Sequence, residues 1–139
     1  MRPIATIDFE RESLRDGLRR HRVSTAAPTF FSWLGATMYL KEDAIDAALR
    51  SVAAFPKESE IVLTFALTGD APSVARRAAS YGEPWVSCFA PDAIEAKLRS
   101  AGFADVVPLA PEEAEAGYFR GRSGDLPVPK RTNILYAVV

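Results

Sequence analysis

The run Ile61-Val-Leu-Thr-Phe-Ala-Leu67 decides the fold class. Its nearly continuous apolar character is typical of a strand that is covered on both faces in a parallel sheet. The preceding stretch, Glu42 to Phe55, has apolar residues at helical spacing and is closed by Pro56. Helices that alternate with buried strands are the arrangement of α/β proteins. We therefore predict an α/β fold with a mostly parallel sheet.

The alternation of strand and helix extends over most of the chain. Pro28 to Trp33, rich in aromatic residues, is predicted to be a buried strand that ends at a tight loop. Pro91 to Ala101 is predicted to be a helix, because its first-turn proline and the following Gly102 are typical helix boundaries. Further strands are predicted at residues 4–7, 105–109 and 133–139, and further helices at 10–21, 73–80 and 111–116. No repeat or interdomain linker is visible, and 139 residues suit a single domain spanning 1–139.

Composition and charge exclude several classes of protein. Hydrophobic residues make up 48% and charged residues 25%, which is ordinary for a globular domain. Lys and Arg number 17 against 18 Asp and Glu, so no global field favours nucleic acid or an anionic membrane. One cysteine, Cys88, and one histidine, His21, do not make up a metal site. No apolar leader is visible and no apolar run approaches the ~18 residues of a membrane span, so a soluble, cytoplasmic protein is expected.

The first candidate site residues are Asp8 and Phe9, directly after the first predicted strand. Ligands of open α/β sheets bind beyond the carboxyl ends of the strands. A carboxylate there could accept a hydrogen bond from an exocyclic amine, and the neighbouring ring could cover a base. The residue types alone favour the alternative, in which Asp8 caps the following helix and Phe9 belongs to the core.

The second candidate segment follows the strand at 28–33. Its density of aromatic residues is usual for a core, but Trp33, Leu34 and Gly35 come just past the strand end. We therefore expect these three residues to border the principal pocket.

The third candidate is the basic loop that begins at Tyr118 and includes Arg122. It could receive an acidic substrate, although solvated charge is the more ordinary interpretation. Cys88 has no evident base and is interpreted as a structural thiol. None of the glycines forms a dinucleotide-binding or phosphate-binding motif.

Four stretches together resemble one known family: 7–14 (Ile-Asp-Phe-Glu-Arg-Glu-Ser-Leu), 28–40 (Pro-Thr-Phe-Phe-Ser-Trp-Leu-Gly-Ala-Thr-Met-Tyr-Leu), 82–85 (Gly-Glu-Pro-Trp) and 118–122 (Tyr-Phe-Arg-Gly-Arg). They resemble the C-terminal half of bacterial leucine carboxyl methyltransferase-like enzymes, which are S-adenosylmethionine-dependent O-methyltransferases. The resemblance covers the chain from about Ile4 to the terminal strand. It implies a partial Rossmann-like methyltransferase sheet that lacks the first two strands, with Ile4 to Ile7 as the third.

The resemblance also implies roles for individual residues. Asp8 and Phe9 would lie beside the adenine of the cofactor, and the segment Ser32, Trp33, Leu34 and Gly35 would line the cofactor and substrate pocket. The substrate-pocket residues are then expected to be Tyr39, Tyr118 and Arg122. No catalytic residue is assigned, because a carboxylate acceptor is already ionised at neutral pH and needs no general base.

Departures from the family pattern bear on activity. Relatives carry a glycine-rich loop and an acidic residue in an N-terminal half, and this chain begins after both, so we expect a truncated chain or one half of a split enzyme. The isolated chain is then predicted to bind S-adenosylmethionine weakly or not at all. Lys41 and Ala90 stand where relatives have Thr and Asp as helix caps, each at a cost of roughly 1 kcal/mol. Thr64 stands where an Asp is expected.

Two functions from different classes follow. The first is a small-molecule O-methyltransferase with a carboxyl or hydroxyl acceptor. The alternative is a non-catalytic, homo-oligomeric interaction module that kept the sheet and lost the cofactor site. In either case we expect a homo-oligomer or a missing N-terminal half as partner, with Met1 to Phe9 as the segment exchanged between copies, and no nucleic acid or membrane.

Overall fold

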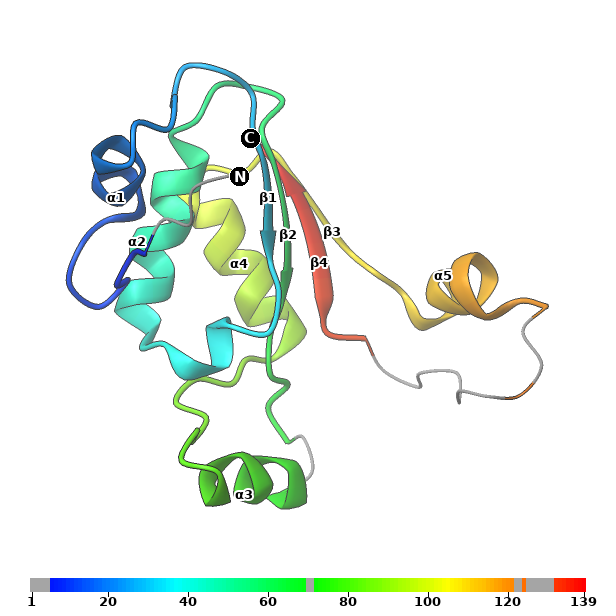
Figure 1. The fold of residues 1–139 in the computed structure, drawn as a ribbon. Coiled ribbons are helices and arrows are strands. Elements are labelled where there is room, and N and C mark those ends of the chain that lie inside the picture. The colour runs from blue at the N-terminus through cyan, green and yellow to red at the C-terminus, as the bar shows by residue number, and fades with distance from the viewer. Residues whose placement is uncertain (1–5, 70–71, 122–123, 125–131) are drawn as a thin grey trace.

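A four-stranded sheet forms the centre of the protein (Figure 1). The computed structural model describes residues 6–69, 72–121, 124 and 132–139. The strands lie in the order β1-β2-β4-β3, which confirms the α/β class together with the helices between them. Their bounds are β1 Phe30–Trp33, β2 Glu60–Thr64, β3 Asp105–Pro108 and β4 Ile134–Val138.

The sheet is mixed, and the prediction of mostly parallel pairing is not met. β1 pairs with β2 in parallel, whereas β4 pairs antiparallel with both β2 and β3. β1, β2 and β3 therefore run in one direction, and β4 alone runs against them. A parallel neighbour needs a crossover that packs on the sheet. The helical residues that follow β3, at 111–119, instead stand away from the sheet (Figure 1), and β4 runs back beside β3 in the antiparallel direction.

Three helices cover one face of the sheet (Figure 1). They are α1 Leu14–Arg20, α2 Glu42–Ala53 and α4 Pro91–Ala101. Alternate strand residues, including Ile61, Leu63 and Leu135, point to this face and are almost completely buried against helix residues such as Leu49 and Leu98. The core of the protein lies between this face and the helices.

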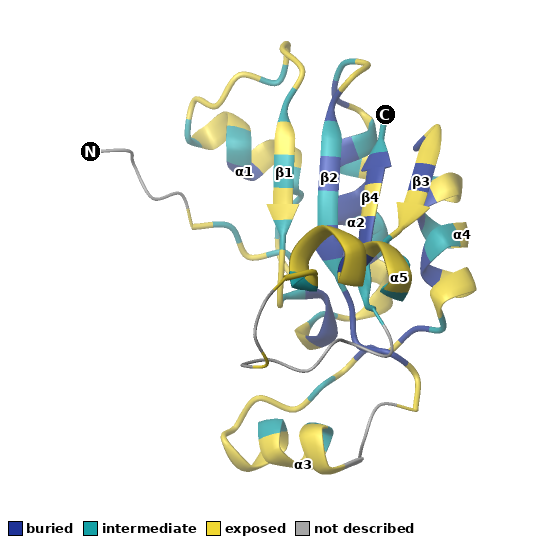
Figure 2. Cartoon of the chain, turned by 90° about the vertical axis from the view of Figure 1, so that its right-hand side faces the viewer, coloured by how far each residue is buried: buried dark blue, intermediate teal, exposed yellow. Residues whose placement is uncertain are grey.

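The opposite face of the sheet, called here the outer face, carries no helix over its upper half (Figure 2). Phe30 in β1 is 60% exposed, and Val107 and Tyr136 are also exposed. The prediction of a buried strand at 28–33 is therefore wrong, because β1 is an edge strand with one open face. β2 is likewise fully buried only on its helix side, where Ile61 and Leu63 lie.

The helix ends follow the expected cap chemistry. α2 and α4 begin after Lys41 and Ala90, and neither residue makes a side-chain capping hydrogen bond. α1 is capped by Ser13, whose Oγ accepts a hydrogen bond from the Asp16 amide at 3.1 Å. This cap explains why the helix begins at residue 14 and not at residue 10. α4 has the bounds predicted from Pro91 and Gly102, and Gly102 adopts the left-handed conformation with φ of 116°.

The predicted strand at 4–7 is not present in the part that the structure describes. Ile4 and Ala5 lie outside the described residues, and residues 6 and 7 form no strand. Ile7 instead packs on α1, where a Cβ at Gly17 would come within 2.7 Å of the Ile7 Cγ1 atom. Arg20 donates a hydrogen bond to the carbonyl of Thr6 at 3.1 Å. The described end of the N-terminal segment thus contacts its own chain, and exchange between copies gains no support from it.

The remaining helices extend away from the sheet. α3 Pro72–Ser80 projects beyond the carboxyl ends of the strands, and α5 Pro111–Ala114 continues into the π-helical segment η2 Glu115–Phe119 (Figure 1). A short 3-10 turn, η1 Thr37–Tyr39, precedes α2 and was not anticipated. Within the described ranges, no helix is long and apolar enough to cross a membrane.

Candidate functional site

Phe9, Ser32 and Trp33 meet at a small cavity beside β1. The cavity has a volume of about 140 Å³ and lies among residues of α1, α2 and the inner side of the sheet. The rings of Phe9 and Trp33 are in contact, with centroids 5.8 Å apart and planes inclined by 41°. Three of the predicted cofactor residues are therefore neighbours in space, although residues 9 and 33 are far apart in the sequence.

Asp8 precedes Phe9 in the chain, does not line this cavity and holds a tight turn. Its Oδ1 accepts a hydrogen bond from the amide of Glu10 at 3.0 Å, and its Oδ2 lies 3.3 Å from Nε of Arg11. Because Ser13 caps α1, the alternative of Asp8 as the helix cap is wrong. The side chain of Asp8 is 52% exposed, so the carboxylate can still accept a hydrogen bond from a ligand.

The indole of Trp33 has an unused hydrogen-bond donor. Its Nε1 is buried, and no acceptor lies within range in the described part of the chain. A buried donor without a partner costs about 1–3 kcal/mol. Since Trp33 also lines the small cavity, this N–H is a group to which a ligand acceptor could bind.

The loop after β1 is tied to β2 by Thr64. The amide of Gly35, which has φ of +67°, donates to Oγ1 of Thr64 at 2.7 Å. Oγ1 of Thr37 donates to the carbonyl of Thr64 at 2.8 Å. The sequence interpretation treated Thr64 only as a departure from the family. A polar residue within the apolar run 61–67 was the signal that it has a structural partner.

Leu34 and Tyr118 come together on the outer face. Two adjoining cavities lie between this face and the α5–η2 segment, with volumes of about 480 and 380 Å³, and we call them the outer groove. Leu34 lines the larger cavity and Tyr118 lines both. Consecutive residues of a strand point to opposite faces. Trp33 therefore lines the small cavity on the helix side, while Leu34 lines the groove on the outer side.

The predicted substrate pocket is only partly assembled. Tyr39 ends η1, the turn that precedes α2, and lines neither cavity of the outer groove. Arg122 lies outside the described residues, as does most of the basic loop. Of the three predicted substrate residues, Tyr118 alone is placed at a cavity within the described ranges.

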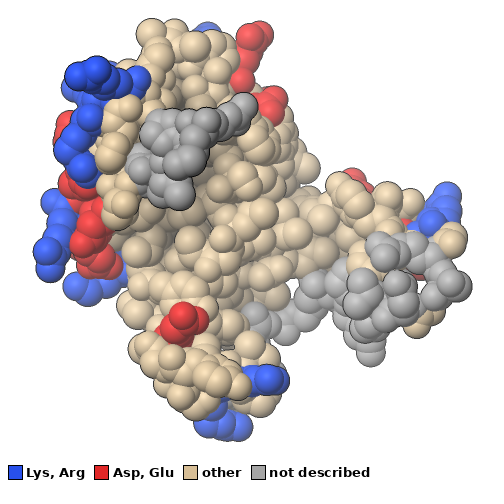
Figure 3. Space-filling model, in the orientation of Figure 1, with Lys and Arg blue, Asp and Glu red and all other residues tan. Residues whose placement is uncertain are grey.

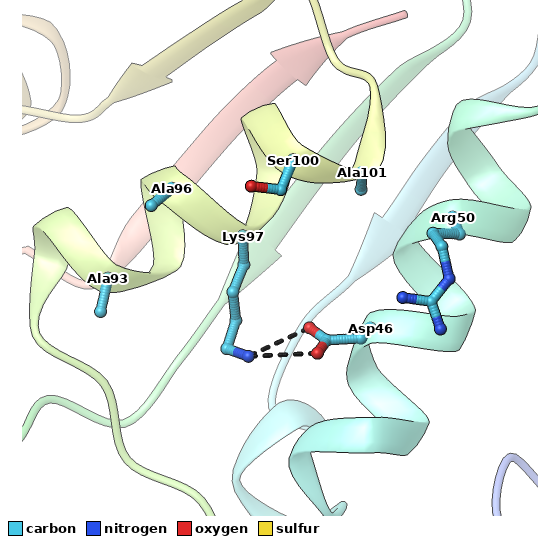
Figure 4. A pocket seen from close by; sticks show the side chains of 7 residues that line it. All are labelled: Asp46, Arg50, Ala93, Ala96, Lys97, Ser100 and Ala101. Carbon is cyan, nitrogen blue, oxygen red and sulfur yellow. Dashed lines mark hydrogen bonds and ion pairs between the residues drawn. The ribbon is translucent and has the colours of Figure 1, made fainter.

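A further cavity of about 310 Å³ lies between α2 and α4 (Figure 4). Lys97 crosses it to Asp46 at 3.1 Å and also contacts Glu42 at 3.0 Å. Burial alone lowers the pKa of Lys97, but the hydrogen bonds and charges of Glu42 and Asp46 outweigh burial and raise the pKa. Lys97 therefore stays charged at neutral pH and joins two helices, so it is not a candidate base.

Tyr136, at the centre of the outer face, is also held in one protonation state. Its pKa is raised first by the hydrogen bond with Glu60, then by burial, and then by the charges of Glu60 and Asp105. The phenol therefore remains protonated at neutral pH, with its hydroxyl hydrogen-bonded to Glu60 and within reach of the charge of Asp105.

Comparisons with known proteins gave a family match and a similar solved structure. Residues 1–53 match the family model of leucine carboxyl methyltransferase. Among solved structures, the chain is similar to SibL, an S-adenosylmethionine-dependent methyltransferase in its apo form, with 13% sequence identity and a TM-score of 0.47. The similarity covers 90% of this chain and 38% of SibL, so the chain spans little more than a third of that protein. No curated protein matches the chain.

The family match contains the predicted cofactor residues. Asp8, Phe9 and the segment 32–35 lie within residues 1–53, whereas the motifs at 82–85 and 118–122 lie beyond them and stay a prediction. The family resemblance seen in the sequence is thus confirmed over residues 1–53, which match the family model of leucine carboxyl methyltransferase.

Proposed function

We propose that this chain is the adenine-side part of an S-adenosylmethionine-dependent O-methyltransferase that acts on a small molecule through its carboxyl or hydroxyl group. The observation that carries the proposal is the family match over residues 1–53, which contains the cluster of Phe9, Ser32 and Trp33. The acceptor, the methyl donor and the need for a second segment all belong to the proposal.

The residues present suit one end of the cofactor. The carboxylate of Asp8 accepts hydrogen bonds, the rings of Phe9 and Trp33 offer apolar faces, and the Trp33 N–H lacks an acceptor within the described ranges. The adjoining cavity of about 140 Å³ is smaller than the roughly 300–1,000 Å³ of ordinary ligand pockets. These residues can therefore hold part of a nucleoside and not the whole cofactor.

The rest of the cofactor site would come from a second segment. Within these 139 residues, no glycine-rich loop of the dinucleotide-binding or phosphate-binding kind occurs. We therefore assign cofactor binding at useful affinity to the chain together with a polypeptide that carries such a loop, either as the other half of a split enzyme or as the part lost by truncation.

The reaction would take place at the loop after β1. S-adenosylmethionine, when bound, supplies an electrophilic methyl group on its sulfonium centre. The role of this chain is to position the two reactants: Trp33 on the helix side and Leu34 on the outer side mark the boundary between donor and acceptor. Tyr118 and Leu34 would contact an apolar acceptor in the larger outer cavity. A carboxylate acceptor needs no base, whereas a hydroxyl acceptor would use one from elsewhere.

A complementation assay tests the proposal. The chain is mixed with an N-terminal fragment of a leucine carboxyl methyltransferase-like enzyme that carries the glycine-rich loop. Transfer of a radiolabelled methyl group is then measured with aromatic carboxylic acids and phenols as acceptors. We expect transfer with both polypeptides and none with either alone. Absence of transfer, together with no cofactor binding by the mixture, would contradict the proposal.

Matched variants connect the assay to the site. Asp8→Ala removes one charged acceptor and is expected to weaken cofactor binding by the mixture about tenfold. Asp43→Ala removes an exposed carboxylate in the first turn of α2, and no change in cofactor binding is expected. Equal effects of the two substitutions on cofactor binding would show that Asp8 does not belong to the cofactor site.

The alternative function, a non-catalytic homo-oligomeric module, is favoured by one observation. The outer face presents apolar side chains such as Phe30 and Val107 to solvent, and no helix covers the upper half of this face (Figure 2). Exposed apolar surface of this kind marks interaction sites. Cofactor binding separates the two functions, because the module requires none.

A further inference from the structure

Two surfaces of this chain lack partners within the described residues, and they are complementary. One is the upper outer face, formed by Phe30, Val62, Val107 and Tyr136 across the strands. The other is helix α3, which makes no extensive contact with any other helix or strand in the described part of the chain (Figure 1).

The upper outer face is apolar with acidic groups at its rim. Each of its four apolar residues comes from the strand face that points away from the helices. Glu113 lines the cavity beside them, and Glu60 and Asp105 lie near Tyr136. No Lys or Arg is among the described residues that line either cavity of the outer groove. The face therefore suits an apolar element with positive charge beside it.

Helix α3 has this character. Val74 and Ala78 stand at positions i and i+4 of α3, which places them on one side of the helix, and Tyr81 directly follows the last helical residue. Val74 is 49% exposed and Tyr81 is 73% exposed, so this side faces solvent. Arg76 and Arg77 supply two positive charges within the helix. Figure 3 shows Lys and Arg side chains at the lower end of the molecule, where α3 lies, and a largely uncharged surface beside the sheet.

The dimensions agree as well. A helix of nine residues is about 14 Å long. Four neighbouring strands are about 14 Å wide from the first axis to the last, and strands of four or five residues are about as long. α3 can therefore cover the upper outer face whichever way it lies on the sheet.

We propose that α3 of one copy packs on the upper outer face of a second copy through the side that carries Val74 and Ala78, which places Arg77 beside the acidic rim. This inference does not depend on the methyltransferase proposal. The larger outer cavity adjoins the covered face, because Val62 lines both cavities of the outer groove. If each copy contributes α3 to the other, the two contacts form a closed dimer. If each copy instead binds a further copy in a head-to-tail manner, a larger assembly forms.

Charge reversal in solution tests the proposal. Light scattering on the purified chain is expected to show a dimer or larger assembly that dissociates on dilution. The double variant Arg76→Glu, Arg77→Glu is expected to raise the dissociation constant at least about tenfold, because it places acid against acid. The variant Asp105→Lys, Glu113→Lys is expected to do the same by placing base against base. Combining all four substitutions in one chain is expected to restore assembly.

The control reverses the same number of charges elsewhere. Arg15→Glu, Arg19→Glu changes two exposed residues of α1 on the helix side, and no effect on assembly is expected. Circular dichroism and urea unfolding establish that each variant is folded. A wild-type monomer at all concentrations, assembly that survives either reversal, or failure of the combined variant to reassemble would overturn the proposal.

Cross-linking gives a readout that does not depend on charge. In a Cys88→Ser background, one tagged chain carries Val74→Cys and a second carries Val107→Cys. Mild oxidation of the mixture is expected to join the two differently tagged chains through a disulfide between these cysteines. The pair Val74→Cys with Arg15→Cys is the control and is expected not to link. Equal linking of both pairs would contradict the position of α3 on the outer face.

Discussion

Ala90→Ser is expected to stabilise the protein by filling a vacant helix cap. Ala90 precedes α4 with φ of −72° and ψ of 149°, and Ser13 precedes α1 with φ of −71° and ψ of 148°. The Ser13 Oγ accepts a hydrogen bond from the amide three residues on. With the same backbone geometry, a serine at position 90 places its Oγ near the corresponding amide of Ala93.

The size of the effect follows from the state of that amide. Replacing alanine by serine at an N-cap is ordinarily worth about 1 kcal/mol. The Ala93 amide already donates to Oδ1 of Asp92 at 3.0 Å, which removes part of the gain. We therefore expect about 0.5–1 kcal/mol of added stability, or a rise in Tm of about 2–4 °C for a chain of this length.

Urea unfolding followed by circular dichroism measures the change. Ser13→Ala is the opposite perturbation and is expected to cost about 1 kcal/mol. Ala104→Ser, at an exposed position outside the helices, is the control and is expected to stay within about 0.5 kcal/mol of wild type. A neutral Ala90→Ser together with a destabilising Ser13→Ala would refute the conclusion that position 90 is an unfilled cap.

Three further predictions concern single contacts. Lys97→Met keeps the aliphatic stem but removes the ion pairs between α2 and α4; because the carboxylates are partly exposed, urea unfolding is expected to show a loss of only about 0.5–1 kcal/mol. The raised pKa of Tyr136 means that its hydrogen bond to Glu60 stabilises the fold below about pH 10 and is lost as the pH rises through the folded-state pKa. Tyr136→Phe is therefore expected to reduce the loss of stability above pH 10 in unfolding measured from pH 8 to 11. Gly17→Val places methyl groups where Ile7 packs and is expected to cost about 1–3 kcal/mol, and an unchanged urea midpoint would contradict this packing.

The sequence predicts those elements whose signals are local. α4 begins and ends as predicted because Pro91 and Gly102 act within one turn of the helix. α2 is likewise recognised from its own apolar spacing. The exposure of β1 is not local, since it depends on which elements lie on each side of the sheet. The apolar run at Phe30 was therefore interpreted as buried, although one of its faces is open.

In the candidate site too, some features were predicted from the sequence and others depend on the fold. Phe9 and Trp33 were assigned to one site through the family resemblance, and the structure brings their rings together. The larger cavity at Leu34 and Tyr118 requires the position of α5 relative to the sheet, which no sequence pattern gives. Tyr39 and Tyr118 were both predicted to belong to the substrate pocket, but only Tyr118 lines the outer groove.

The central claim, that Phe9 and Trp33 hold the adenine end of the cofactor, is tested most directly by nuclear magnetic resonance on the isolated chain. The protein has two tryptophans, so its spectrum contains two indole N–H signals, and Trp33→Phe assigns them. S-adenosylhomocysteine is added up to millimolar concentration, which detects weak binding. The account predicts that the Trp33 signal shifts without saturating at micromolar ligand, while the Trp85 signal stays in place. An unmoved Trp33 signal, or saturation of its shift at micromolar ligand, would contradict the account.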